Sequence, residues 1–560
     1  MAETFVIRKS SFNIFWRILE IWRPETWVLF LALIAGGIAT IWSYSKDYII
    51  AYGDAESHLN IAKRVVDSLT PEFAQLGGIW LPLPHIFLMP FVYFDWLWRT
   101  GLAGSIVSGI AFIISAVYIY KIAHLLTKNT GASFLAALVF ILNPNILYLQ
   151  STPMTELSLI VFFVLSSYNF ILFLKDEELL PLIMAAFFGF CATLSRYDGW
   201  ALVMMEAGIL FLYYFPVAFG FGGEDEPEGE NDAGEDIATL EDRSLFKETW
   251  SLFEGRLILF GTLAFAGIAL WLFWSFLILG DPLYFTHSQF SANSQQMGWL
   301  AKGQLPAYHN IIASLKYYFV TAMSSAGVFI FIAAILGMLL FLFDRASKNR
   351  FFILLLLLVP FFFNVLTLFL GQSIIFIPSL TPITFEWTLF NVRYGVMMVP
   401  FVAIFLGYLA NRSGIFGKTL IVGLIVAQTV LYIIGFSPVL ALDDGTRGLS
   451  SQAAKLPDAQ YWLEAHYDGG LVLMDDYKRL LSVIRTPIPM KNIIYIGNKP
   501  YWEESLVAPE TYARWIIIQK GDELWNKIYE DPGLNGRLYK YFEKAYTSED
   551  ILIFRRMRDN

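Results

Sequence analysis

The chain has 560 residues, of which 56% are hydrophobic, 17% are aromatic and 16% are charged, and its net charge is −9. Soluble domains carry about 25% charged residues. Here the deficit falls in long apolar stretches, so the composition excludes an ordinary soluble protein and indicates a polytopic membrane protein. The sequence has no basic stripe that would bind a nucleic acid. Its single cysteine, Cys191, excludes an intrachain disulfide and a Cys-x-x-Cys metal site.

Apolar stretches long enough to cross a bilayer, about 20 residues each, recur along most of the chain. They predict a polytopic α-helical membrane protein with about 11 transmembrane helices. The basic segment Phe5–Arg23 is followed by no cleavage site, so we expect the first span to be a signal anchor. The predicted spans are 27–45, 101–123, 131–149, 156–174, 180–197, 200–218, 256–279, 324–343, 351–370, 394–411 and 418–436.

Lysine and arginine residues gather in only some of the loops, and this bias predicts the orientation. If the spans alternate, all the basic groups lie on the cytoplasmic side, as the positive-inside rule requires. An odd number of spans then places residues 440–560 outside, together with the first outer loop (46–100). We therefore predict an integral protein of the plasma (cytoplasmic) membrane. The basic groups lie before the first span and at 121–128, 175, 243–256, 345–350 and 412–418.

The apolar segment Ile79–Trp98 is an exception, because counting it as a span would invert every later loop. It contains Pro82, Pro84, Pro90 and Asp95, which disfavour a continuous transmembrane helix. We predict a juxtamembrane helix in the outer interface, where Trp and Tyr are common. A crossing segment is the alternative.

Two further segments differ in composition from the spans. Residues 220–244 include the acidic, glycine-rich stretch GFGGEDEPEGENDAGEDIATLED, which predicts a disordered cytoplasmic loop. Beyond a transmembrane module (1–439), residues 440–560 alternate short β-like runs with helix-like stretches, which is typical of a small α/β domain. We expect this extracytoplasmic domain to fold separately and to cover the site. Its Asp475–Asp476 pair is expected to end the strand GLVLM in a turn rather than to act as a catalytic dyad.

Polar and charged residues collect at the outer ends of the predicted spans. Ionisable residues at membrane depth are costly, so they are functional candidates by default. A carboxylate can act as a base toward a hydroxyl group, and arginine can hold a phosphate through paired hydrogen bonds. Together they suit transfer of a group from a phosphate-bearing lipid to an acceptor. The candidates are Asp54, Glu56 and His58 in YGDAESH, His85 in PLPHIF, Glu156 in QSTPMTE, Arg196 and Asp198 in SRYDGW, and Arg393 and Tyr394 in FNVRYG.

The ordered motifs YGDAESHLNIAKRVVDS, WLPLPHIFLMPF, NPNILYLQSTPMTE, LSRYDGW and NVRYGVMMVP resemble those of the GT-C glycosyltransferases. The likeness is to the protein O-mannosyltransferase and lipid A aminoarabinosyltransferase type, with the family 39-like fold. It covers the N-terminal half and weakens between Pro216 and Gln372. It implies a hexosyl or pentosyl transferase that uses a polyprenyl- or dolichyl-phosphate sugar, such as dolichyl phosphate mannose. The acceptor would be a protein, a lipid or a glycan, and no cofactor or obligatory metal is implied.

The same resemblance implies individual roles. Asp54 would be the general base that deprotonates the acceptor, and Glu156 would be the acidic residue of the second outer loop. Arg393 and Arg196 would contact the donor phosphate, and in-line displacement would invert the anomeric centre. Many relatives have adjacent Asp and Glu in the first loop, whereas an alanine separates Asp54 from Glu56 here. Residues two apart do not share a helix face, which puts the role of Glu56 in doubt.

Each assignment has a structural alternative. Asp54 could cap the helix that follows it, and Glu156 could cap the fourth span. Arg196 and Asp198 could form an ion pair that closes the end of a span. Arg393 could extend to lipid head groups.

The remaining candidates are also open to two interpretations. His58, four residues after Asp54, could orient that carboxylate or could simply pack, and His85 could touch the substrate. Tyr394 could belong to the aromatic belt at the membrane surface. Asp54 and Glu156 could hold a divalent cation together with phosphate, although the resemblance favours no metal.

Two other classes of protein compete with the enzyme. A lipid or solute transporter, or flippase, would need polar groups near the bilayer midplane, whereas here the charges gather at one surface. A non-catalytic anchor for the outer domain would not need so many spans. For the enzyme, we expect the loops Asp281–Asn310 and Gly371–Asn391 to shape the sugar pocket.

Overall fold

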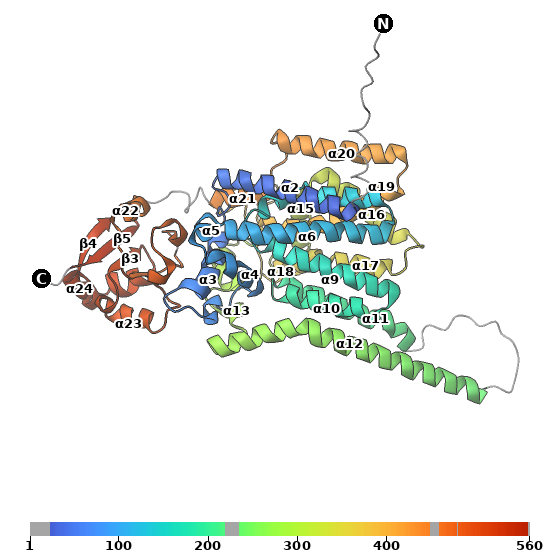
Figure 1. The fold of residues 1–560 in the computed structure, drawn as a ribbon, viewed down its shortest axis with the longest axis horizontal. Coiled ribbons are helices and arrows are strands. Elements are labelled where there is room, and N and C mark those ends of the chain that lie inside the picture. Colours follow the sequence, from blue (N-terminus) through green and yellow to red (C-terminus); the bar gives the residue numbers. More distant parts are fainter. Residues whose placement is uncertain (1–22, 219–234, 449–457, 479, 558–560) are drawn as a thin grey trace, which may run out of the picture.

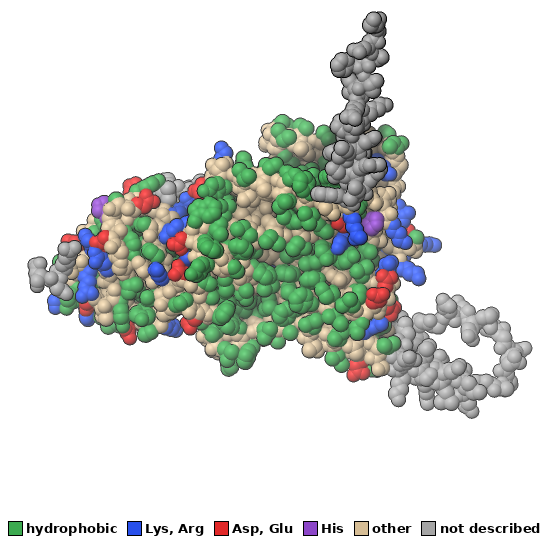
Figure 2. Space-filling view, in the orientation of Figure 1, with side chains coloured by type: hydrophobic (Ala, Val, Ile, Leu, Met, Phe, Trp, Pro, Cys, Tyr) green, Lys and Arg blue, Asp and Glu red, His purple; other side chains and the backbone are tan. Residues whose placement is uncertain are grey.

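The computed structural model describes residues 23–218, 235–448, 458–478 and 480–557. It consists of a bundle of long helices and a smaller sheet-bearing part at one end of the bundle, as Figure 1 shows. Hydrophobic side chains cover the visible face of the bundle, and charged side chains gather toward its two ends (Figure 2). This distribution is that of a protein whose middle is solvated by lipid and whose ends are solvated by water.

Each predicted span corresponds to a helix or to two consecutive helices. The fold is therefore a polytopic α-helical membrane fold, as predicted. The helices of the bundle are α2 (Pro24–Ser45), α6 (Leu102–Thr127), α7 (Thr130–Ile141), α8 (Pro144–Leu149), α9 (Glu156–Asp176), α10 (Leu179–Thr193), α11 (Asp198–Ala218), α12 (Glu235–Leu279), α15 (Ile311–Ala326), α16 (Val328–Phe343), α17 (Arg350–Leu357), α18 (Val359–Phe369), α19 (Val399–Arg412) and α20 (Ile415–Ile433).

Two pairs of consecutive helices are bent: α15, which was not predicted as a span, meets α16 of the predicted span 324–343, and α17 meets α18 within the predicted span 351–370. Helices α15 and α16 meet at 109°, and α17 and α18 meet at 48°. Gly327 lies at the first bend with a φ of 91°, a conformation that favours glycine. Pro360 follows the second bend and cannot donate the hydrogen bond that would continue the helix. Within the described residues, six helices pass a length and hydropathy test for spanning, or up to eight if each bent pair is one span. The count of about 11 therefore stays a prediction.

The first outer loop folds into four short helices. They are α3 (Gly53–Asp67), the 3-10 helix η1 (Phe73–Leu76), α4 (Leu83–Val92) and α5 (Asp95–Thr100). Ten residues of α-helix extend about 15 Å, which is half the hydrocarbon thickness of roughly 30 Å. Helix α4 is therefore too short to cross a bilayer alone, which fits a juxtamembrane segment. Two further short helices, α13 (Tyr284–His287) and α14 (Ala292–Ala301), lie in the loop between α12 and α15. The 3-10 helix η2 (Val392–Met398) directly precedes α19.

The acidic loop differs in part from its prediction. Residues 220–234 lie outside the described residues, as do residues 5–22 near the N-terminus. Residues 235–244 are helical rather than disordered, because α12 begins at Glu235. The sequence from Ile237 to Trp250 lacks glycine and proline and contains two Leu, two Glu and one each of Ala, Arg and Lys, all of which favour helix.

The C-terminal part contains a five-stranded mixed sheet with the order β2-β1-β3-β5-β4. Strand β1 is parallel to both β2 and β3, whereas β5 is antiparallel to β3 and β4. The predicted α/β architecture is confirmed. The elements are α22 (Asp458–His466), β1 (Val472–Met474), η4 (Val483–Arg485), η5 (Met490–Asn492), β2 (Ile493–Ile494), α23 (Tyr501–Val507), η6 (Pro509–Thr511), β3 (Trp515–Gln519), η7 (Trp525–Tyr529), α24 (Pro532–Tyr541), β4 (Phe542–Thr547) and β5 (Ile551–Arg556).

The first helix of the segment predicted as the C-terminal domain packs against the helical bundle. Helix α21 (Leu440–Gly448) precedes the sheet, but its first residues, Leu440 and Ala441, are buried in the core of the helical bundle. The backbone N–H of Ala441 donates to Asn145 Oδ1 at 2.9 Å. By its contacts α21 belongs to the bundle, and the α/β part begins with α22.

One face of the sheet is shared with the first outer loop. The hydrophobic cluster on this face joins Val472 and Trp515 of the sheet to Leu59 of α3 and Trp98 of α5. The opposite face carries a second cluster, in which strand residues such as Ile516 and Phe554 pack against the C-terminal helices α23, η7 and α24. Arg99 of α5 reinforces the joint by donating to backbone carbonyls in the segment around η4. The C-terminal part is therefore packed onto the first outer loop rather than tethered beside it.

Candidate active site

Four sequence-distant elements bring charged side chains together at the end of the bundle nearest the sheet. Asp54 lies in the first turn of α3, Glu156 is the first residue of α9, and Asp198 is the first residue of α11. Carboxylates are favourable there because a helix N-terminus carries a partial positive charge. Arg393 comes from η2, the short helix before α19. The site is thus made of helix ends, which explains why its residues border apolar runs in the sequence.

Arg393 is the centre of this cluster and is almost completely buried. Its Nη2 donates to Asp54 Oδ2 at 2.8 Å, and its Nε donates to Glu156 Oε1 at 3.1 Å. Its Nη1 donates to Asn391 Oδ1 at 2.7 Å. Asp54 remains 39% exposed, whereas the Glu156 side chain is fully buried. One arginine therefore joins an accessible carboxylate to an inaccessible one.

Arg196 supports the buried side of the cluster. Its Nη1 lies 3.4 Å from Glu156 Oε1 and 3.0 Å from Thr155 Oγ1, and its Nε lies 3.3 Å from Asp198 Oδ2. The ring of Tyr394 lies within cation–π distance of two guanidinium groups, 5.3 Å from that of Arg196 and 5.0 Å from that of Arg393. Tyr394 is thus an integral part of the cluster and not a residue of a lipid-facing belt.

The capping alternatives do not describe these carboxylates. Helix α3 begins at Gly53, and its N-cap residue is Tyr52, which makes no side-chain capping hydrogen bond. Helix α9 likewise has Thr155 at its N-cap position. Asp54 and Glu156 lie inside the first turns and direct their oxygens at Arg393. The predicted ion pair between Arg196 and Asp198 is present, but Arg196 also reaches Glu156.

Three predicted candidates lie apart from Arg393 in the contacts that the structure describes. Glu56 Oε2 accepts a hydrogen bond from Ser482 Oγ in the C-terminal part at 2.8 Å. His58 and His85 are both buried, with His58 Nδ1 at 2.9 Å from His85 Nε2. Burial lowers the pKa of His85 to about 4, so this histidine is neutral at physiological pH. Substrate-binding roles for Glu56, His58 and His85 stay predictions.

Two participants were not predicted from the sequence. Asp444 in α21 places Oδ2 at 3.9 Å from Arg393 Nη1 and at 3.5 Å from the Tyr52 hydroxyl. Burial raises the pKa of Asp444 to about 6, although Arg393 opposes the shift. Asn391 holds Arg393 while its own backbone adopts a φ of 54°, which asparagine tolerates better than most residues. The motif FNVRYG contained Asn391, but Asp444 followed the last span in a stretch without a recognisable motif.

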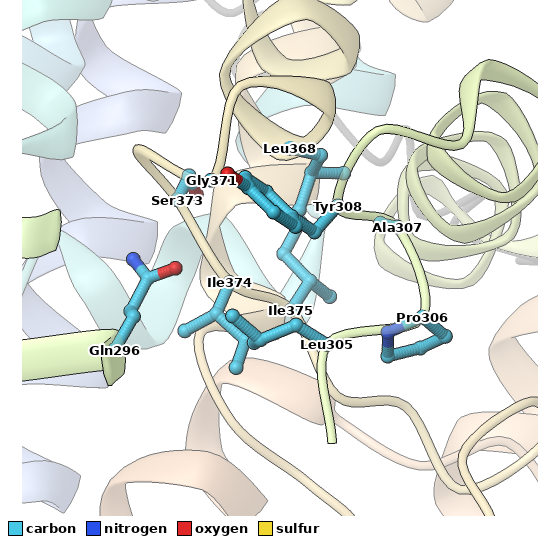
Figure 3. Close-up of a pocket in the computed structure, with 10 residues that line it drawn as sticks. All are labelled: Gln296, Leu305, Pro306, Ala307, Tyr308, Leu368, Gly371, Ser373, Ile374 and Ile375. Carbon is cyan, nitrogen blue, oxygen red and sulfur yellow. The ribbon is translucent and has the colours of Figure 1, made fainter. Parts of the chain in front are cut away.

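A small pocket lies beside the cluster, between the two loops that were expected to shape the sugar site. Gln296 and Leu305 from one loop and Ile374 from the other line it, as Figure 3 shows. Asn391 Nδ2 donates to the Ile374 carbonyl at 3.2 Å, which ties the pocket wall to Arg393 through one side chain. Its cavity volume is only about 10 Å³, roughly the room that one water molecule needs. Recognition of a sugar by these loops stays a prediction.

The charges of the cluster are paired internally. Within the described part of the chain, no group of three or more His, Cys, Asp or Glu side chains could hold a metal ion. The carboxylates near Arg393 are held by guanidinium groups. The arrangement can polarise a hydroxyl through Asp54 and can present positive charge to an anion through Arg393.

The fold is that of a polytopic α-helical membrane protein with a charged cluster at one end of its helical bundle. The structure is similar to that of ArnT from Cupriavidus metallidurans, which was solved bound to undecaprenyl phosphate. The TM-score is 0.53 at 10% sequence identity, and the alignment covers 94% of this chain and 98% of ArnT. At this identity the likeness establishes a shared fold, and the resemblance expected from the motifs is confirmed at that level.

A second similarity is to the oligosaccharyltransferase AglB from Archaeoglobus fulgidus, solved with an inhibitory peptide and a dolichol-phosphate. Its TM-score is 0.43 at 11% identity, and the alignment covers 95% of this chain and 74% of AglB. No known family profile matches the sequence. No curated protein sequence matches it either.

Proposed function

We propose that the protein is a glycosyltransferase that moves a sugar from a polyprenyl- or dolichyl-phosphate donor to an acceptor. The observation that supports this most strongly is the position of Arg393, which joins Asp54 and Glu156 from distant outer loops. A partly exposed base beside a buried guanidinium suits displacement of a phosphate from a sugar. The shared fold with ArnT, which was solved with a lipid phosphate, supports the same substrate class.

The proposed reaction assigns each charge a task. Asp54 accepts the proton of the acceptor hydroxyl while the acceptor oxygen bonds to the anomeric carbon. The bond between that carbon and the phosphate oxygen breaks, and its electron pair leaves with the lipid phosphate. Arg393, supported by Arg196 through Glu156, stabilises the charge that develops on the leaving group. Attack from the face opposite the phosphate inverts the anomeric centre.

The orientation in the membrane belongs to the same proposal. The sheet lies at one end of the bundle (Figure 1), and α3, which carries Asp54 of the cluster, packs against it. Arg345, Lys348 and Arg412 border helix ends in loops predicted to be cytoplasmic. The positive-inside rule then places the active site and the C-terminal part on the extracytoplasmic face.

A transporter remains the second candidate because of one residue inside the bundle. Glu206 of α11 is completely buried and accepts a hydrogen bond from Ser166 Oγ at 2.7 Å. Carboxyl groups at membrane depth are a feature of transport pathways. However, Ser166 Oγ also lies 2.9 Å from the Ala185 carbonyl oxygen, so this serine also links α9, α10 and α11 as structural packing would.

The test uses purified protein in detergent with a panel of polyprenyl-phosphate sugars, and it measures release of lipid phosphate and transfer of the sugar. We expect one member of the panel to be consumed, slowly by hydrolysis without an acceptor and faster when the acceptor is present. If no lipid phosphate is released, and the reconstituted protein instead moves an intact lipid between leaflets, the enzyme proposal is wrong and the transporter stands.

A further inference from the structure

The charged cluster contains more negative than positive side chains. Four carboxylates, those of Asp54, Glu156, Asp198 and Asp444, surround two guanidinium groups in the described ion pairs. With every group ionised, the four negative and two positive charges leave a net charge of −2. A sugar–phosphate lipid is a phosphodiester and brings one more negative charge. Donor binding therefore requires that a carboxylate move, take up a proton or be compensated by a cation.

The contacts of Arg393 show which carboxylate is easiest to replace. Asp54 and Glu156 accept hydrogen bonds of 2.8 and 3.1 Å from Arg393. Asp444 lies 3.9 Å from Nη1, which is an ion pair without a hydrogen bond. A phosphate oxygen that took the place of Asp444 would gain a charge-assisted hydrogen bond and would leave the other contacts of Arg393 intact.

The surroundings of Asp444 favour its neutral form. The groups that face it are Arg393 from η2, Tyr52 before α3, Asp54 in α3 and Tyr148 in α8. Asp443 and Arg447 are the other charged residues of α21. Arg393 is the group that opposes protonation of Asp444 most, ahead of the hydrogen bonds from the Tyr52 hydroxyl and the Val392 backbone, and a bound phosphate would neutralise the influence of Arg393. The start of α21 is anchored to the bundle by the hydrogen bond from Ala441 to Asn145, so Asp444 need only turn its carboxyl group away from Arg393 to make room for the phosphate.

We propose that Asp444 occupies the phosphate position on Arg393 in the empty enzyme and yields it by taking up a proton when the lipid phosphate binds. This inference rests on the proposed function, because it assigns a regulator to the same donor site. The proton comes from solvent, and no bond other than O–H forms. Since the pKa of Asp444 is already raised to about 6 by burial, donor binding should be accompanied by uptake of about one proton above that pH.

The experiment measures binding and not turnover, so that Asp54 does not enter the pH profile as a catalytic base. The probe is the methyl ester of a polyprenyl phosphate, a phosphodiester whose charge does not change between pH 5.5 and pH 8.5. Its dissociation constant is measured across that range for the wild type, for Asp444→Asn and for Asp443→Asn. The last variant is the matched control, because Asp443 is the neighbouring carboxylate of the same helix. Thermal unfolding of each variant at each pH checks that the protein is folded.

For one linked proton, the dissociation constant of the wild type should rise about tenfold per pH unit above pH 6, and Asp443→Asn should behave alike. Asp444→Asn should bind with little pH dependence and, at pH 8, more tightly than the wild type. If the wild type binds the probe without pH dependence, or if Asp444→Asn keeps the wild-type slope, Asp444 is not the group that yields. If the folded wild type binds no phosphodiester at any pH, the proposed function fails as well.

Discussion

Replacing Asp54 by asparagine separates catalysis from structure more cleanly than any other change in the cluster. Asparagine has nearly the same shape, and its side-chain oxygen can still accept the hydrogen bond from Arg393 Nη2. Only the negative charge and the basic oxygen are lost. Arg393 keeps its 3.1 Å contact with Glu156, so no buried guanidinium is left without a carboxylate.

The expected magnitudes for stability and rate are very different. Because the Asp54 side chain is 39% exposed, solvent screens its ion pair, and the loss of stability should be no more than about 1 kcal/mol. A positioned general base contributes about 10²- to 10⁴-fold to a rate, which is roughly 2.7 to 5.5 kcal/mol of barrier height. We therefore predict a turnover reduced at least 100-fold in a protein that unfolds near the wild-type temperature.

The assay is sugar transfer by detergent-purified protein, with thermal unfolding measured on the same samples. Asp67→Asn is the matched control, because it makes the same chemical change at the C-terminal end of α3. Asp67 pairs with Lys63, which also contacts Asp95, so the turnover of this variant should stay within a few-fold of the wild type. Transfer by Asp54→Asn within tenfold of the wild type would refute the assignment of Asp54 as the base.

Three other predictions concern stability and topology. Glu156→Gln removes the buried charge between two guanidinium groups and should lower stability by about 3–5 kcal/mol; a thermal unfolding curve like that of the wild type would contradict this. Arg64 and Asp476 form a mostly buried ion pair between α3 and the end of β1. Replacing both by alanine should therefore lower the free energy of unfolding by less than the sum of the two single replacements, with a difference of about 0.5–3 kcal/mol. Additive losses of stability would show that the pair is not coupled. In intact cells, a membrane-impermeant thiol reagent should label Lys499→Cys, on the proposed outer side, but not Ala346→Cys, on the proposed cytoplasmic side. Both positions are exposed and the native cysteine is buried, so only the side of the membrane should decide labelling. The reverse pattern would invert the proposed orientation.

The sequence predicted the central charges of the site because their environment is unusual. Asp54, Glu156, Arg196 and Arg393 each border an apolar run, where an ionisable side chain is costly and therefore noticeable. Asp444 escaped notice because it follows the last span in a polar segment, where a carboxylate is ordinary. Its importance arises only when α21 folds back onto the bundle, and no local pattern in the sequence encodes that contact.

The first motif also shows what sequence proximity cannot decide. Asp54, Glu56 and His58 lie within five residues, yet an α-helix rotates by about 100° per residue. Position 56 therefore points away from position 54, and the structure directs it to Ser482 in the C-terminal part. His58 returns to a similar angle but packs against His85. No pattern in YGDAESH indicates that α3 packs against a sheet about 400 residues later in the chain.

The Asp475–Asp476 pair combines a predicted role with an unexpected one. Asp475 Oδ1 accepts from the backbone N–H of Tyr477 at 2.8 Å, as a residue that ends a strand in a turn would do. Asp476 instead pairs with Arg64 of α3. The expectation that residues 440–560 fold separately stays a prediction, and the shared hydrophobic face makes us expect an isolated fragment to expose that face.

The hydrophobic face that the sheet shares with the first outer loop also has a consequence for folding during synthesis, because its two sides are made at different times. Its two halves, at Trp98 in the first outer loop and at Ala459 in the C-terminal part, are separated by about 360 residues of chain. A ribosome adding about 5–20 residues per second needs roughly 20 to 70 seconds to cover that distance. During this time the loop 46–100 carries an apolar surface without its cover, which is a defined target for a folding factor. A chain that stops early also lacks Asp444 and the sheet, and it cannot form the complete charged cluster.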